Sequence, residues 1–271
     1  MSATLSTPRL SSAQVEFYKR EGYVIYREPV FAPAKFQGLK HHFEAKLAAL
    51  PPDGRPESMD VPHFTDTKLF DWLFSDEALD LVEPLLGPDI CLFSSHFICK
   101  PKGNGKRVPW HEDSFYWRGM IDPMEVATIW LAIDPSTEVN GGMQVISRTH
   151  NHGYSDYEPV DPAKNVFHIE IIEAQRDASR IVKMDLEPNQ CSIHDGKLIH
   201  GSPPNTSTIR RCGYTMRYMP SYVKLNPEKT HHQVYLARGK DRSGGANKYA
   251  DPTRSYEHLA RYRELHGKNG H

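Results

Sequence analysis

The sequence predicts an all-β core with flanking helices, either a β-sandwich or a jelly-roll barrel. From Ile90 onward, short apolar or alternating runs are separated by Pro, Gly, Asn and Asp residues. No long helical pattern lies between these runs, so we expect no crossover helices and no parallel sheet. Helical patterns precede the runs, and we expect these helices to pack outside the barrel.

The helical patterns lie in the N-terminal third of the chain. Ser11 begins the first one with a capping-box pattern, and Gly22 can end it. Residues 23–26 then have strand composition. Further helices are expected over 33–50 and 66–87, where apolar residues recur at spacings of three and four.

The strand-like runs occupy the middle of the chain, and the C-terminal part reads as a loop and a helix. The tail helix would carry Tyr256, Leu259, Tyr262 and Leu265 on one side. The runs that we expect to form strands are 90–99, 126–133, 143–146, 166–172, 181–186, 198–200 and 211–219.

A length of 271 residues with 38% apolar content fits one domain with a substantial core. We divide it into a helical part (1–88), the β core (89–225) and a C-terminal loop and helix (226–271). Because 33 basic residues nearly balance 34 acidic ones, we expect neither nucleic acid nor a membrane as partner. Four widely spaced cysteines and the lack of a signal-peptide or membrane-spanning pattern predict reduced thiols and a cytoplasmic protein.

The first candidate metal motif is His111-Glu112-Asp113. If this segment is a strand, the side chains of His111 and Asp113 point to the same face and can meet one cation. The chain contains 15 histidines, so one such pair is expected by chance and is weak evidence alone.

The second candidate motif is His200, which ends an apolar run eleven positions before Arg211. Two histidines and one carboxylate leave three sites of an iron open, enough for a bidentate co-substrate and dioxygen. An arginine on a neighbouring strand can bind the far carboxylate of such a co-substrate. Strand periodicity puts Arg211, Gly213, Thr215 and Arg217 on one face, with Gly213 leaving room beside Arg211.

These motifs, in this order, resemble the phytanoyl-CoA dioxygenase family of Fe(II)/2-oxoglutarate oxygenases. The resemblance extends from YKREGYVIY near the N-terminus through WHEDSFYW, TIWLAIDPSTEVNGGMQVI and HGSPPN to LARGKDRSGGANKY. It implies a double-stranded β-helix, that is, a cupin-like jelly-roll barrel. The chain departs from the family's usual turn at Ser147-Arg148-Thr149-His150, which leaves the geometry of that turn and the role of His150 open.

The resemblance also assigns roles to individual residues. It implies that His111, Asp113 and His200 bind the iron and that Arg211 binds the distal carboxylate of 2-oxoglutarate. Ser202 would hydrogen-bond to that carboxylate, and Trp130 and Thr128 would line its pocket.

Several of these residues have alternative interpretations. His194 lies six positions before His200 and could compete for the ligand role, while Trp130 could be an ordinary core aromatic. Tyr116, Trp117 and Arg118 follow the first motif and could form a wall of the substrate site. They could equally form a packed aromatic corner with a solvated arginine.

The implied activity is hydroxylation of an unactivated carbon of a small molecule, with O2 and 2-oxoglutarate consumed and succinate and CO2 released. The intact carboxylate Asp113 favours hydroxylation over halogenation, while desaturation or ring chemistry stays open. Cationic residues near the first motif, including Lys100, Arg107 and Arg118, favour an amino-acid-like or phosphonate substrate, whereas nearby aromatics fit a natural product. The rivals are a metalloenzyme that needs no 2-oxoglutarate and a non-catalytic metal- or ligand-binding barrel. The oligomeric state is not assigned.

Overall fold

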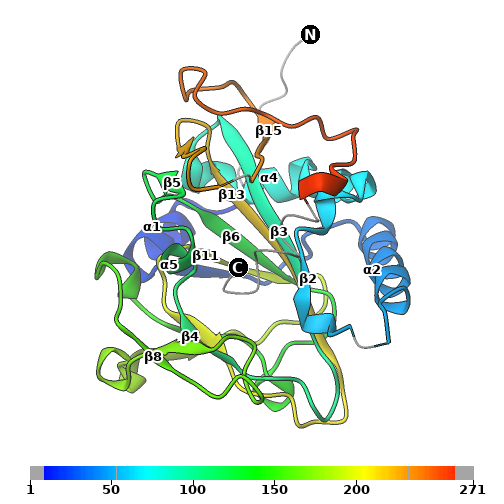
Figure 1. The fold of residues 1–271 in the computed structure, drawn as a ribbon, viewed down its shortest axis with the longest axis vertical. Coiled ribbons are helices and arrows are strands. Elements are labelled where there is room, and N and C mark those ends of the chain that lie inside the picture. Colours follow the sequence, from blue (N-terminus) through cyan, green and yellow to red (C-terminus); the bar gives the residue numbers. More distant parts are fainter. Residues whose placement is uncertain (1–8, 53, 231, 260–271) are drawn as a thin grey trace.

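Two antiparallel sheets face each other in the computed structural model, which describes residues 9–52, 54–230 and 232–259 (Figure 1). This arrangement confirms the jelly-roll core with flanking helices. The larger sheet has the order β1 (Tyr23–Tyr26), β11 (Cys191–Asp195), β6 (Ala127–Ala132), β13 (Arg211–Pro220), β3 (Ile90–Lys100) and β15 (Tyr235–Arg238), and β2 (Met59–Asp60) also pairs with β3. The smaller sheet has the order β10 (Ile181–Lys183), β7 (Gln144–Ile146), β12 (His200–Ser202) and β4 (Val108–His111). Short pairs join β5 (Ile121–Asp122) to β14 (Lys224–Leu225) and β8 (Tyr157–Pro159) to β9 (Ile169–Ile171).

Helices cover the outer face of the larger sheet, and in Figure 1 α1 and α2 flank it on opposite sides of the view. The α-helices are α1 (Ser12–Glu21), α2 (Pro33–Ala48), α3 (Phe70–Leu73), α4 (Asp76–Leu86) and α5 (Asp113–Tyr116). Short 3-10 helices occupy Pro56–Ser58, Pro62–Phe64, Thr67–Leu69, Glu138–Asn140, Thr149–Asn151, Glu173–Gln175 and Ala178–Arg180. The capping box at Ser11 and the left-handed Gly22 at the end of α1 are as predicted.

The two faces of the larger sheet differ in chemistry. Its outer face carries Tyr214, Met216 and Tyr218 of β13, which pack into one hydrophobic core with residues of α2 and α4. Arg211, Thr215 and Arg217 of the same strand line a pocket on the inner face. The predicted alternation along this strand is therefore confirmed, and it separates the hydrophobic core from a polar interior.

The boundaries of several predicted segments were wrong. The strand predicted over 23–26 is confirmed as β1. However, β1 and β2 from the segment 1–88, and β15 from the C-terminal segment, belong to the larger sheet, so the β core extends beyond 89–225. Strand β11 was missed because its inward residues, Ser192 and His194, are polar and weaken the apolar signal. The helix expected over 66–87 is broken before α4. Tyr262 and Leu265 lie outside the described residues.

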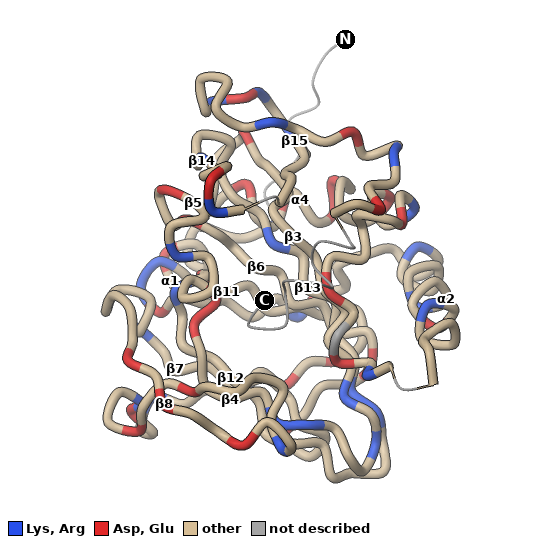
Figure 2. The backbone as a smooth tube through the Cα atoms, viewed as in Figure 1, with Lys and Arg blue, Asp and Glu red and all other residues tan. Residues whose placement is uncertain are grey.

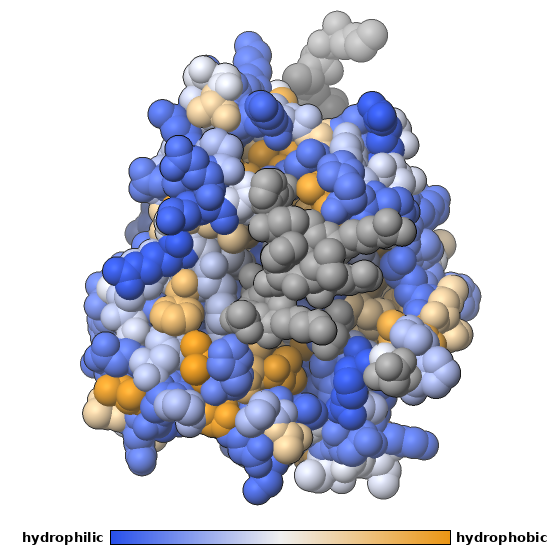
Figure 3. All heavy atoms as spheres, in the orientation of Figure 1, coloured by the Kyte–Doolittle hydropathy of each residue, from blue (hydrophilic) through white to orange (hydrophobic). Residues whose placement is uncertain are grey.

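The surface offers no strong field of one sign. Figure 2 shows basic and acidic residues interspersed along most of the backbone, and the face drawn in Figure 3 is largely hydrophilic with small hydrophobic areas. Within the described ranges, no helix has the length and apolar character needed to span a bilayer. All four cysteines are buried and unpaired, as predicted.

Gly22 provides a test of how α1 is joined to the barrel. Its φ of +83° is left-handed, and an added Cβ would lie 2.5 Å from Nδ1 of His150. Gly22→Ala should therefore lower the free energy of unfolding by about 2–4 kcal/mol, combining left-handed strain with overpacking. Chemical denaturation measures this loss.

Gly244→Ala is the matched control, because Gly244 also has a positive φ, +69°, but no neighbour within 4 Å of an added Cβ. It should cost only about 1 kcal/mol. Equal losses in the two variants would contradict the tight contact between the end of α1 and His150.

Candidate functional site

Three side chains with ligand atoms converge between the two sheets. In the pairing of β4 with β12, His111 lies opposite His200, and their ring centroids are 4.1 Å apart. Asp113 joins them, and one ligand atom from each residue lies within 4.8 Å of the others. All three side chains are buried. The structure thus brings together the three residues that the sequence singled out.

The expectation that His111 and Asp113 point to the same side is confirmed, although the strand itself ends at His111. Glu112 is extended, with φ −116° and ψ 134°, but Asp113 is already the first residue of α5. Because Glu112 is extended, the carboxylate of Asp113 points to the same side as the His111 ring and reaches the histidines. Glu112 points elsewhere and accepts a hydrogen bond from the backbone N–H of Ser155 at 2.9 Å.

Backbone carbonyls set the orientation of both histidine rings. Nδ1 of His111 lies 2.8 Å from the carbonyl of Pro109, and Nδ1 of His200 lies 2.9 Å from the carbonyl of Leu198. A carbonyl only accepts, so each Nδ1 carries the proton and each Nε2 keeps its lone pair. Burial lowers the pKa of His111 to about 3 and also lowers that of His200. Both rings are therefore neutral, as metal ligands must be.

The unusual turn at 147–150 connects the end of α1 to the strand that carries His200. Ser147 and Arg148 both donate to the carboxylate of Glu21, at 2.6 and 2.9 Å. The His150 ring contacts the carbonyl of Lys19 at 3.1 Å, which ties the turn to the end of α1. Thr149 Oγ1 accepts from the N–H of Ile199 at 2.9 Å, directly before His200.

Arg211 carries a buried positive charge in the same pocket as the triad. Its side chain donates to the carbonyl of Gly141 at 2.9 and 3.1 Å and to Oγ of Ser202 at 3.3 Å. Burial lowers its pKa to about 10, so it stays charged near neutral pH. Across the described parts of the chain, no carboxylate forms an ion pair with Arg211. Because a buried charge is costly without a counter-charge, this arrangement fits an anionic ligand.

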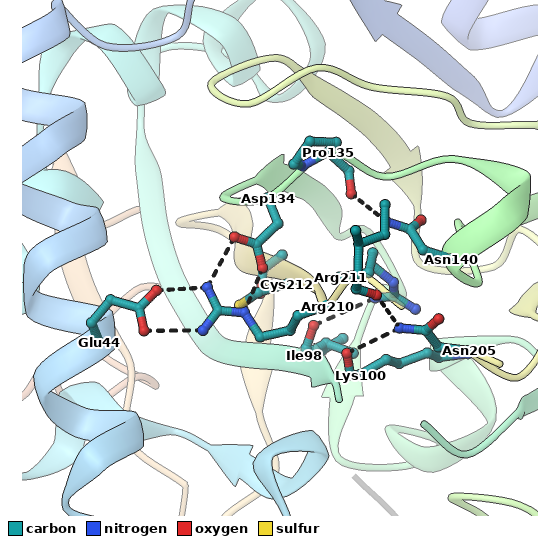
Figure 4. Close-up of polar contacts among 12 residues, drawn as sticks. Glu44, Ile98, Lys100, Asp134, Pro135, Asn140, Asn205, Arg210, Arg211 and Cys212 are labelled. Atoms are coloured by element: carbon teal, nitrogen blue, oxygen red, sulfur yellow. Dashed lines mark hydrogen bonds and ion pairs between the residues drawn. The ribbon is translucent and has the colours of Figure 1, made fainter. Parts of the chain in front are cut away.

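The neighbouring Arg210 shows the contrast (Figure 4). Its guanidinium lies between Glu44 of α2 and Asp134, at 2.6 and 2.7 Å. These two hydrogen-bonded carboxylates raise its pKa. Arg210 is thus fully compensated, whereas Arg211 is available to a ligand.

Gly213 makes room for Trp130 beside Arg211. A Cβ at Gly213 would lie 2.2 Å from the indole ring of Trp130. The guanidinium carbon of Arg211 lies 5.3 Å from the centroid of that ring, within cation–π range. Trp130 lines the pocket and also packs into a small hydrophobic cluster, as a core aromatic would.

The pocket at the triad has both polar and apolar lining residues. Its lining includes Ser202 and Arg211 at one end and His111, His200 and His194 near the triad. The His194 ring lies 4.7 Å from that of His200, but His194 is not part of the described metal-ligand cluster. Thr128 is buried directly opposite His194 on β6 and is not among the lining residues.

The residues after the first motif have different environments. The Tyr116 ring lies 6.2 Å from that of His111, and Trp117 is buried against Phe93 at 5.0 Å. Arg118 is exposed and stacks on Tyr154, which matches the alternative of a solvated arginine.

Other cations near the motif are already engaged. Nζ of Lys100 donates to the carbonyl of Ser202 at 3.3 Å, and Arg107 forms an ion pair with Glu170. Lys100, Arg107 and Arg118 are not among the residues that line the pocket of the triad. Arg217 was the missed cation: it lines the pocket and approaches Asp113 at 3.3 Å. Its alternation with Arg211 was the signal that could have identified it.

His111, Asp113 and His200 could together bind a divalent metal. They offer two imidazole nitrogens and a carboxylate, all buried, and both rings have the tautomer that leaves Nε2 free to bind a metal. We expect His200→Ala to weaken Fe(II) binding by more than about 100-fold, since losing a supporting residue alone costs 10- to 100-fold. An anaerobic competition titration with a chelating dye measures the affinity.

His194→Gln is the control, since it alters the rival histidine beside the triad. Its Fe(II) affinity should stay within a few-fold of the wild-type value. A large loss in this variant, with normal binding in His200→Ala, would reverse the assignment.

Comparison with known proteins agrees with this geometry. The model of the family described as Phytanoyl-CoA dioxygenase (PhyH) matches residues 18–213. The chain is 26% identical over 160 residues to a phytanoyl-CoA dioxygenase domain-containing protein 1 homolog of Dictyostelium discoideum, covering 58% of this chain and 56% of the relative. It is 27% identical over 160 residues to a probable alpha-ketoglutarate-dependent hypophosphite dioxygenase of Stutzerimonas stutzeri, covering 55% and 52%. The matches thus span about half the length of these curated relatives.

A solved structure supports the fold independently. The non-heme monooxygenase ThoJ in its apo form superposes with a TM-score of 0.72 at 23% identity, covering 93% of both chains. At this identity the likeness concerns the fold.

Proposed function

The chain belongs to the phytanoyl-CoA dioxygenase family, and on that premise we propose that it is an Fe(II)- and 2-oxoglutarate-dependent dioxygenase. One observation carries the proposal: Arg211, buried and paired with no carboxylate in the described ranges, shares a pocket with the His111, Asp113 and His200 cluster. A metal that retains open sites and a dicarboxylate co-substrate would satisfy both features.

Each residue has a defined part in the proposed reaction. His111 and His200 would bind the metal through Nε2, and Asp113 through its carboxylate. Arg211 and Ser202 would bind the distal carboxylate of 2-oxoglutarate, with Trp130 as a wall of that pocket. Bound Fe(II) would supply the sites at which 2-oxoglutarate and O2 react. The protein contributes orientation, burial and exclusion of water.

We propose hydroxylation of an unactivated carbon of a small molecule, with release of succinate and CO2. The carboxylate of Asp113 supports hydroxylation, because halogenating relatives replace it with a small residue. Desaturation or ring chemistry would use the same residues. Amino-acid-like, phosphonate and natural-product substrates are the candidate classes, and the hypophosphite named for the S. stutzeri relative is also a small anion.

We also infer that the chain acts as one domain, since the larger sheet takes strands from all three predicted segments. A cytoplasmic location is proposed because the four buried cysteines are unpaired, which suits a reducing compartment.

Arg211→Met tests the co-substrate site. Removing the charged partner of a buried carboxylate should raise the apparent KM for 2-oxoglutarate by about 10- to 100-fold. Succinate formation, followed over a range of 2-oxoglutarate concentrations, gives this constant. Arg210→Met is the control: it removes an arginine one residue away that pairs with Glu44 and Asp134, and it should leave the constant unchanged. An unchanged constant in Arg211→Met would remove Arg211 from the co-substrate site.

Asp113→Ala tests the metal site and separates an enzyme from a binding barrel. The variant should lose succinate formation while keeping the circular dichroism spectrum of the folded protein. Turnover that persists in this variant would exclude Asp113 as a ligand. If the wild-type protein binds iron normally but no metabolite mixture stimulates succinate formation, the non-catalytic barrel would be favoured.

A further inference from the structure

We propose that the pocket contains a second anion-binding subsite, centred on Arg217, which receives an acidic group of the primary substrate. The inference rests on the proposed function, because it assigns to the substrate the part of the pocket that 2-oxoglutarate does not need. It narrows the substrate class to small organic anions.

The position of Arg217 supports a separate subsite. It lies six residues after Arg211 on the inner face of β13, beside Asp113 rather than beside Ser202. Arg217 lines the pocket of the triad and also a smaller adjoining cavity. That cavity is lined by Asp60, Phe93, Ser94, Trp117, Met120, Arg217 and His232.

The hydrogen bonds of Arg217 are few and long. A guanidinium has five N–H donors, and charge-assisted bonds are typically about 2.7–2.9 Å. Nε of Arg217 lies 3.3 Å from Oδ2 of Asp113, and Nη1 lies 3.5 Å from Oγ of Ser94. The side chain is nevertheless buried, with 3% of the residue exposed. Arg217 thus retains donor capacity for a further anion.

The charge balance of the site with Fe(II) and 2-oxoglutarate bound also favours an anionic substrate. Fe(II), Arg211 and Arg217 together carry four positive charges, whereas Asp113 and the 2-oxoglutarate dianion carry three negative ones. Glu57 also lines the pocket, but its charge is offset by an ion pair with Arg55. Asp60 at the smaller cavity is partly exposed, with its side chain at 28%, and lies 3.6 Å from Nδ1 of His96. Because solvent screens an exposed charge, the buried excess is best offset by a substrate anion.

Orphaned polar atoms on the neighbouring strands provide a second, independent observation. Arg217 of β13 pairs in register with Thr128 of β6, which pairs with His194 of β11. Both ring nitrogens of His194, Oγ1 of Thr128 and Oγ of Ser192 are buried without a hydrogen-bond partner. Of these residues, His194 lines the pocket, so its unpaired ring nitrogens favour a polar ligand there, whereas Thr128 and Ser192 lie behind the lining residues.

The apolar residues that line the smaller cavity indicate the chemistry of the rest of the substrate. Phe93, Trp117 and Met120 belong to one hydrophobic cluster, and Trp117 also lies 5.5 Å below the guanidinium of Arg217. These side chains suit an apolar or aromatic portion of a small acid. The alternative is that Arg217 only supports Asp113, in which case no acid would be preferred over its neutral analogue.

A matched ligand panel tests the subsite. Protein loaded anaerobically with Fe(II) and saturating 2-oxoglutarate is titrated with small aliphatic and aryl carboxylates and phosphonates, each paired with its neutral amide or ester. The visible charge-transfer band of the Fe(II)–2-oxoglutarate chelate reports the result, since binding nearby perturbs the band and displacement of 2-oxoglutarate bleaches it. We expect at least one acid to bind roughly 10- to 100-fold more tightly than its neutral partner.

Arg217→Met should remove that preference, whereas Arg242→Gln, which alters an exposed arginine paired with Asp89, should preserve it. Met120→Trp leaves the guanidinium in place but fills the smaller cavity, and it should weaken acid binding. If Arg217→Met no longer shows the band of the Fe(II)–2-oxoglutarate chelate, the acid binding of Met120→Trp tests the subsite instead.

The outcomes separate the two proposals. Absence of the band in the wild-type protein would overturn the proposed function. A normal band with no acid preferred, including no acid binding at millimolar concentration, would overturn the subsite alone. Acid preference that persists in both Arg217→Met and Met120→Trp would also overturn it.

Discussion

Two antiparallel sheets face each other here across buried polar side chains, and most features of the site follow from this constraint. The hydrophobic core lies on the other side of the larger sheet, where Tyr214, Met216 and Tyr218 pack against the helices. Side chains alternate along a strand, so every second residue of β13 enters the space between the sheets. Burying Arg211 there is unfavourable unless a ligand supplies a counter-charge, and Arg217 has only a long contact with Asp113, which is also a candidate metal ligand. The interior is therefore arranged for occupants that the chain does not itself provide.

The same constraint explains how the proposed ligands are oriented. His111 and His200 come from paired strands of the smaller sheet, and backbone carbonyls hold their rings. Their neutral tautomers are thus set before a metal binds. Asp113 enters from the start of α5, while Arg211 approaches from the larger sheet. A metal and a dicarboxylate would join the two sheets through these residues, and the smaller cavity at Arg217 would leave a separate place for substrate.

Local patterns predicted much of this arrangement. The capping box and Gly22 defined α1, and period-two alternation separated the two faces of β13, because both signals depend on near neighbours in the sequence. The helical start at Asp113 was missed, since a strand and a turn can present the same His-x-Asp spacing. Contacts between residues far apart in the chain also could not be predicted from the sequence. Arg210 finds Glu44, 166 residues away, and this pairing distinguishes it from Arg211. Arg107 and Lys100 looked available for the same reason, although Glu170 and a backbone carbonyl engage them.

The most direct test of the account is a crystal structure of the protein with Mn(II) and 2-oxoglutarate, with the metal located by anomalous scattering. We predict one strong peak bound by Nε2 of His111, the carboxylate of Asp113 and Nε2 of His200. The distal carboxylate of 2-oxoglutarate should accept hydrogen bonds from Arg211 and Ser202. A metal bound elsewhere, or a co-substrate that leaves the buried guanidinium of Arg211 unpaired, would contradict the account.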